Sequence, residues 1–60
     1  MSSALQAALV ALRDGEEPAR REAVEVLRGS DRPEAIPALL AAVGDDSWNV
    51  RQAAIEALVG

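Results

Sequence analysis

The sequence contains no cysteine, no histidine and no lysine, and its only aromatic residue is Trp48. The absence of cysteine excludes disulfides. With histidine missing as well, the usual zinc and haem ligands are absent, so we expect no metal site and no cofactor. Ten acidic residues outnumber six arginines, which gives a net charge of −4. This balance argues against sequence-independent nucleic-acid binding and against anionic membranes, because both rely on basic surfaces.

Long hydrophobic runs are also missing. None approaches the roughly 20 residues that span a bilayer, and the alanine-diluted N-terminal stretch has no basic start, so it does not resemble a signal peptide. We therefore expect a soluble, cytoplasmic protein. Sixty residues form one small domain at most, and thirteen of the thirty apolar residues are alanine. Such a thin core suits closely packed helices and often needs a partner surface.

The two halves of the sequence repeat each other. Shifted by thirty-one residues, the chain aligns with itself without a gap, and ten of the twenty-nine pairs are identical. Four of these are alanine pairs, which an alanine-rich chain produces easily. Matches such as Asp14 with Asp45 and Arg20 with Arg51 are more specific. An internal repeat of this period predicts a solenoid, in which each unit buries its apolar face against a neighbour.

The first helix of each repeat is predicted from apolar residues spaced three and four apart. They are Leu5, Leu9 and Leu12 within residues 3–12, and Ile36, Leu39, Leu40 and Val43 within residues 33–43. Ser3 with Gln6, and Asp31 with Glu34, have the spacing of a capping box. Pro37 would remove a backbone hydrogen bond inside a helix, so we expect this helix to start late or to bend.

The second helices are predicted over residues 17–28 and 47–59, followed by Gly29 and Gly60 where a left-handed C-terminal residue is common. The predicted inward stripes are Ala19, Ala23, Val26 and Leu27, and then Val50, Ala54, Ala57 and Leu58. Val24 and Ile55 lie off these stripes and are expected to face a neighbouring repeat.

The predicted fold class is therefore all-α, with two tandem helical hairpins (four helices) stacked as a fragment of an α-solenoid. We expect residues 1–60 to form one domain. Repeat 1 is placed at about residues 3–29 and repeat 2 at about residues 33–60.

The stretch AIPALLAAVGDDSWNVRQAAIEALVG, residues 35–60, resembles the HEAT-like repeat of the short type found in phycobilisome lyases. The shared pattern is AIPALL in the first helix, an aspartate and a short loop, then VR, AA and AL in the second helix. Residues 4–29 match more loosely, since PAR replaces NVR, and Val59 stands where such repeats continue with LG. The TPLH turn of ankyrin repeats and the tryptophan and tyrosine pattern of tetratricopeptide repeats are absent.

The resemblance implies an α-solenoid whose first helices line the convex side and whose second helices line the concave side. It also implies an inter-repeat ladder formed by Asp14, Asp45, Arg20 and Arg51. By that analogy, Asp14 is expected to meet Arg51. Such a pair sets the register of the repeats more than it stabilises them.

Solenoids normally contain at least three repeats with polar caps, whereas this sequence shows two. Val43, Ile55 and Val59 are therefore expected to face outward at an apolar end. Trp48, near the start of the last helix, either covers this surface, including in a self-association contact, or anchors a different partner. A longer parent chain, a second copy or another protein would each supply the missing neighbour.

Residues that suggest chemistry have simpler explanations. The carboxylate pairs Glu16–Glu17 and Asp45–Asp46 lie at predicted helix starts, where acids cap free N–H groups and interact with the helix dipole. The serines have no histidine to activate them. We therefore predict no catalytic residues and no enzyme activity. Arg21, Arg28 and Gln52 are candidate contacts on the concave face, although the neighbouring glutamates favour a solvated, salt-bridged surface.

The sequence thus predicts a non-enzymatic protein-interaction or scaffold module that forms a homo-oligomer through its open apolar end. Two alternatives stay open. The chain is a fragment of a larger HEAT-repeat protein, such as a bilin lyase subunit, or it is a designed minimal repeat protein without a natural ligand.

Overall fold

The computed structural model describes residues 3–60, which form four helices. They are α1 (Ser3–Asp14), α2 (Glu17–Arg28), α3 (Ala35–Ala42) and α4 (Trp48–Val59). Residues 3–60 contain no strand, so the predicted all-α class is confirmed. None of the helices in this range is long and apolar enough to cross a membrane.

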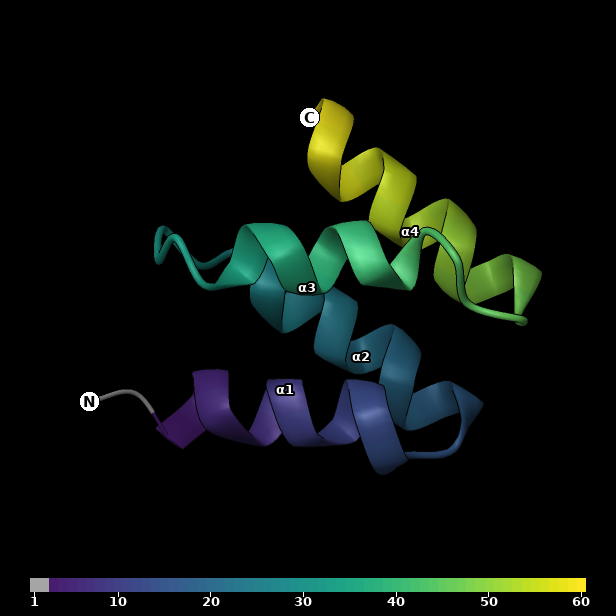
Figure 1. The fold of residues 1–60 in the computed structure, drawn as a ribbon, viewed down its shortest axis with the longest axis horizontal. Coiled ribbons are helices and arrows are strands. Elements are labelled where there is room, and N and C mark those ends of the chain that lie inside the picture. Colours follow the sequence, from purple (N-terminus) through teal and green to yellow (C-terminus); the bar gives the residue numbers. More distant parts are fainter. Residues whose placement is uncertain (1–2) are drawn as a thin grey trace.

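The helices form two hairpins that lie side by side (Figure 1). Helices α1 and α3 run in the same direction, and α2 and α4 run back across them at an angle. Within the hairpins α1 packs on α2 and α3 packs on α4. Between the hairpins, α2 contacts both α3 and α4, and α1 contacts α3. Helix α2 is thus the central element that joins the two repeats.

The start of α3 follows from its proline. The helix begins at Ala35 with Glu34 as N-cap, so Pro37 is its third residue and the missing N–H is not needed for an intrahelical bond. The preceding turn is closed by hydrogen bonds from the Ala35 N–H to the Arg32 carbonyl and from the Ile36 N–H to the Pro33 carbonyl, at 3.1 and 3.2 Å. The late start predicted for this helix is confirmed.

Two predictions about helix ends are wrong. Asp31 and Glu34 do not form a capping box, because the helix starts one residue after Glu34, whose side chain makes no cap hydrogen bond. Gly29 has a φ of −82°, which is right-handed. The N–H groups of Gly29 and Ser30 already bond the carbonyls of Glu25 and Leu27, so no left-handed residue is needed. The Ser3 side chain, predicted to cap α1, lies outside the described part of the chain.

A single apolar cluster extends through both repeats. Its most deeply buried large side chains are Val24, Leu27 and Val50, with at most 1% exposure. The other buried members are Leu5, Ala8, Ala23, Ala35, Leu39, Ala42, Ala53 and Ala54. Among the residues described, no polar or charged side chain is buried in this cluster.

The rotation of α2 differs from the prediction. Ala19 and Val26, expected to point inward, are exposed, whereas Val24 is fully buried. The reason is that α3 and α4 pack on α2 on the side of Val24, whereas Ala19 and Val26 line a hollow between α1 and α2 that repeat 2 leaves uncovered. Val24 therefore faces repeat 2, as its position off the predicted stripe suggested.

Candidate protein-interaction surfaces

One arginine of repeat 1 forms an ion pair with an aspartate of repeat 2. Arg20 of α2 donates from Nε to Asp45 Oδ2 at 2.9 Å and from Nη2 to Asp45 Oδ1 at 3.1 Å, a two-point contact. Its Nη1 donates to the Gly15 carbonyl at 3.0 Å. The side chains of Arg20 and Asp45 are only 19% and 11% exposed. A paired guanidinium and carboxylate in this geometry fixes orientation as well as distance.

This pairing changes the acidity of both groups. Burial raises the pKa of Asp45, but hydrogen bonds from Arg20 and from the Ser47 N–H, together with the positive charge of Arg20, lower it by more, so that the pKa lies below its ordinary value. The hydrogen bond to Asp45 raises the pKa of Arg20. Asp45 is therefore a carboxylate at neutral pH.

A second polar contact joins the repeats, and no sequence pattern predicted it. Glu17 Oε2, in the first turn of α2, accepts from Ser47 Oγ at 2.7 Å and from Asn49 Nδ2 at 3.2 Å. These two hydrogen bonds lower the pKa of Glu17 below its ordinary value. The counterpart of Glu17 in repeat 2, thirty-one residues later, is Trp48, so the repeat alignment does not mark this position.

The predicted ladder has the opposite sense. The arginine comes from repeat 1 and the aspartate from repeat 2, and no ion pair within residues 3–60 joins Asp14 to Arg51. Asp14 contacts neighbouring Arg13 at 3.5 Å and is 64% exposed. The reason is positional: Asp45 lies in the loop that leads into α4, and α4 packs on α2, which carries Arg20. Asp14 and Arg51 thus lie on opposite outer sides of the two-repeat unit.

Large apolar side chains are exposed at the end formed by α3 and α4. We call this set the C-terminal apolar surface. Its members are Ile36, Leu40, Trp48, Ile55 and Val59, with exposures of 52%, 59%, 64%, 41% and 84%. The sequence predicted Trp48, Ile55 and Val59 for such a surface. It did not predict Ile36 and Leu40 there, but only marked them as part of the apolar spacing of their helix. Val43, also predicted to face outward, is half-buried and packs against the core.

The polar residues predicted for the concave face lie on α2 and α4. Arg21 is exposed, and Arg28 Nη1 lies 3.9 Å from Glu25 Oε1. Gln52 Nε2 donates to Glu56 Oε2 at 3.4 Å. These are local contacts within each helix, so nothing in their arrangement distinguishes a ligand site from a solvated face.

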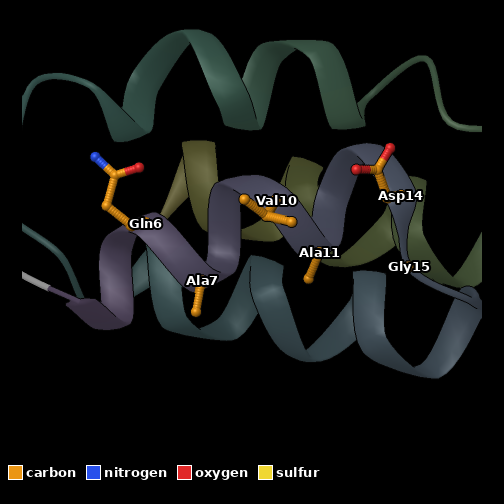
Figure 2. A pocket seen from close by; sticks show the side chains of 6 residues that line it. All are labelled: Gln6, Ala7, Val10, Ala11, Asp14 and Gly15. Carbon is orange, nitrogen blue, oxygen red and sulfur yellow. The ribbon is translucent and has the colours of Figure 1, made fainter.

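The hollows of the molecule are shallow. One of about 480 Å³ lies alongside α1, where Ala7, Val10 and Ala11 are followed by Asp14 at the end of the helix (Figure 2). No group of three His, Cys, Asp or Glu side chains able to hold a metal ion occurs within residues 3–60. The described residues therefore offer surfaces for another macromolecule more than an enclosed site for a small one.

Comparison with known proteins agrees with this architecture. A family model described as HEAT repeats matches residues 5–59, which include both hairpins. Searches among curated proteins and among solved structures give no significant match.

Proposed function

Since the chain belongs to the HEAT-repeat family, we propose that it is a non-enzymatic cytoplasmic scaffold module that self-associates through its C-terminal apolar surface. HEAT repeats are generally protein-interaction modules, and solenoids of this kind present extended surfaces to their partners. For this chain, the interacting surface is the C-terminal apolar surface and its partner is a second copy of the chain.

The observation that carries the proposal is a difference between two equivalent residues. Val24 is fully buried, whereas its counterpart Ile55 is 41% exposed. Since both residues occupy the same place in their repeats, the burial of Val24 comes from the repeat stacked on it. The same stacking is available to Ile55 only from another molecule or another repeat. Removing apolar area of this kind from water favours association.

The polar side chains near the contact between the repeats are engaged in structural hydrogen bonds, which supports a non-enzymatic role. Asp45 and Glu17 are engaged between the repeats, and Ser47 both donates to Glu17 and accepts from the Val50 N–H at the start of α4. These side chains are committed to structure. An activated serine usually needs a histidine beside it, which this sequence lacks, and the carboxylate beside Ser47 is a weak base because the pKa of Glu17 lies below its ordinary value.

Light scattering after size exclusion tests self-association over a hundredfold range of protein concentration. We expect a mass above 6.3 kDa at the high end that falls towards 6.3 kDa on dilution. Circular dichroism at the same concentrations shows whether helicity depends on assembly. A mass of 6.3 kDa throughout the range would contradict the proposal.

Two variants with the same change in net charge serve as probe and control. Ile55→Asp places a carboxylate on the C-terminal apolar surface and should hold the chain at 6.3 kDa. Arg21→Gln also lowers the net charge by one, but it lies on the exposed polar side of α2 and should associate like the parent chain. Equal effects of the two variants would assign the association to charge alone.

The narrower resemblance to the repeats of phycobilisome lyases stays a prediction. Its readout is bilin transfer to an acceptor protein by the purified chain. Transfer activity would overturn the non-enzymatic assignment.

A further inference from the structure

The opposite end of the molecule carries a groove between α1 and α2. It has a volume of about 330 Å³. Two of its lining residues, Ala8 and Ala23, are buried in the core. The other six are Ala4, Ala7 and Ala11 of α1 and Ala19, Glu22 and Val26 of α2. We call it the N-terminal groove. Apart from Glu22, these lining side chains are apolar and small, so a neighbouring helix layer can approach closely.

The six lining residues of the N-terminal groove that are not fully buried each have a counterpart in repeat 2 that is covered. The counterparts are Ala35, Ala38, Ala42, Val50, Ala53 and Ala57, and all six are buried or half-buried. In repeat 1 all but Ala11 of the corresponding residues are exposed. The two repeats pair their helices in the same order, and α2 of repeat 1 packs on both α3 and α4, so we attribute the additional burial in repeat 2 to repeat 1. The groove is therefore the surface by which a repeat receives the repeat before it.

The C-terminal apolar surface is the matching half of the same interface. Its members Ile36 and Ile55 are the counterparts of Leu5 and Val24, which are 7% and 0% exposed because repeat 2 lies on them. One chain thus contains the elements of this interface twice: once joined between its own repeats, and once as two separate complementary halves at its ends.

We propose that the C-terminal apolar surface of one molecule docks into the N-terminal groove of the next, so that copies stack head to tail. The inference rests on the proposed self-association and specifies its geometry. A contact between two different surfaces of the same chain does not close between two molecules, so it builds an open stack, or a ring where the rotation closes, and not a symmetric dimer.

Charge at the two ends agrees with this arrangement. Arg51 is the counterpart of Arg20, and Asp14 is the counterpart of Asp45, the pair that joins the repeats at 2.9 Å. Head-to-tail docking brings Arg51 of one molecule to Asp14 of the next. Asp14 lines the neighbouring hollow along α1 drawn in Figure 2, which shares Ala7 and Ala11 with the groove. The contact between molecules would thus pair an arginine of the preceding unit with an aspartate of the following one, as the contact between repeats does.

The contact between molecules is weaker than the contact between repeats. Glu22 stands in the groove where repeat 2 has Ala53, and Ala19 stands where it has Val50. The groove therefore offers less apolar area and carries a charge that docking covers, which costs free energy. Association is accordingly reversible and depends on concentration.

Mixing two blocked variants tests the geometry. Ala7→Arg fills the groove and leaves the C-terminal apolar surface intact, whereas Ile55→Asp spoils that surface and leaves the groove intact. Both positions are exposed, so circular dichroism should show parental helicity. We expect each variant alone to be monomeric and the equimolar mixture to form a heterodimer of twice the monomer mass. No larger species should form, because the heterodimer has no free, intact pair of surfaces.

Trp48 supplies an independent readout, since it is the only aromatic residue and belongs to the C-terminal apolar surface. With Trp48→Phe added to the Ile55→Asp chain, only the Ala7→Arg chain is fluorescent. Its emission should shift to shorter wavelength on mixing. Self-association of Ala7→Arg alone, or a parent mass that levels off at a dimer, would show that identical surfaces pair and would overturn the head-to-tail arrangement.

Failure of the proposed function is recognised separately. A parent chain that stays at 6.3 kDa at every concentration contradicts self-association itself. A parent chain that associates while the mixture of blocked variants stays monomeric contradicts only the head-to-tail geometry.

A substitution in the groove gives a prediction of opposite sign. Glu22→Ala makes the groove match repeat 2 at this position, so we expect the parent association to tighten by about tenfold. Glu34→Ala removes the same charge from the exposed loop before α3 and should leave the affinity unchanged. Weaker or unchanged association of Glu22→Ala would mean that the groove is not the docking surface.

Discussion

Repeat 1 and repeat 2 follow one sequence pattern, but equivalent residues of the two repeats differ in how far they are buried. Leu5 and Val24 of repeat 1 are 7% and 0% exposed, whereas their counterparts Ile36 and Ile55 are 52% and 41% exposed. The chemical character of the side chains is the same. What differs is that repeat 1 has a neighbour on this side and repeat 2 does not.

On the other side of the repeats the difference is reversed. Ala35 and Val50 of repeat 2 are 1% and 0% exposed, whereas Ala4 and Ala19 of repeat 1 lie on the surface. Ala4 and Ala35 are the same residue type, so this difference in burial comes from the neighbour and not from the side chain. In a solenoid, burial is therefore decided by which units are stacked together as much as by the sequence of the unit.

The largest effect should come from placing a charge at equivalent positions of the two repeats. Val24→Asp buries an unpaired carboxylate, which costs several kcal/mol. A chain of this length has about 3–9 kcal/mol of total stability, so we expect loss of helicity by circular dichroism. Ile55→Asp should keep parental helicity in dilute solution. A folded Val24→Asp chain would show that repeat 2 does not cover this position.

Two adjacent leucines of α3 separate the interior from the C-terminal apolar surface. Leu39 is 3% exposed and Leu40 is 59% exposed. Truncating a buried leucine removes packing and leaves a cavity, so Leu39→Ala should lower the free energy of unfolding by about 2–5 kcal/mol. Leu40→Ala should change it by about 0.5 kcal/mol or less in dilute solution. Urea denaturation of both variants measures the difference, and equal losses would contradict the assignment of the two faces.

The helices were largely predictable because local rules determine them. Residues 17–28 were predicted as a helix and form α2, and Pro37 delayed the start of α3 as its missing N–H requires. The fold class followed from the repeat, since each helical pair needs a neighbour. These features depend on periodicity and on backbone hydrogen bonding within a few residues.

The faces of the helices were harder to predict because tertiary contacts decide them. Ala19 and Val24 have similar local settings on α2, yet only Val24 is buried. The sense of the ion pair was also wrong, since the spacing of Asp14 and Arg51 does not say which repeat lies on which side. The contact of Glu17 with Ser47 and Asn49 has no pattern in the sequence, because it joins residues about thirty positions apart.

Removing Arg20 or Arg51 compares how much the arginine contributes to stability between the two repeats and at the uncovered end of repeat 2. Arg20→Met keeps much of the aliphatic side chain but leaves the partly buried Asp45 without its two-point partner. We expect a lower thermal midpoint in dilute solution, with a smaller loss than for Leu39→Ala. Arg51→Met, at the equivalent position without an ion pair in residues 3–60, should leave the midpoint unchanged. A comparable loss in Arg51→Met would mean that the contact with Asp45 adds nothing to stability.

The smallest expected effect is a dependence of stability on pH that belongs to the contact between the repeats. The pKa of Asp45 lies below its ordinary value, because its hydrogen bonds and the charge of Arg20 outweigh the effect of burial. The unfolded chain therefore binds a proton before the folded chain does, so this stabilisation is complete above the ordinary carboxyl pKa of about 4 and is lost as the pH falls through the lowered value.

Asp45→Asn removes this titration, so it should be less stable than the parent at pH 7 and lose less stability between pH 5 and pH 2. Asp46→Asn changes the adjacent residue. Its carboxylate lies 3.4 Å from Arg20 Nη2 but is 97% exposed, so this contact is weak and the variant should keep nearly the parental dependence. Urea midpoints at a series of pH values measure both. A residual slope in Asp45→Asn is expected from Glu17, whose pKa is lowered by its hydrogen bonds to Ser47 and Asn49. A slope equal to that of the parent would place the acid sensitivity outside the contact between Arg20 and Asp45.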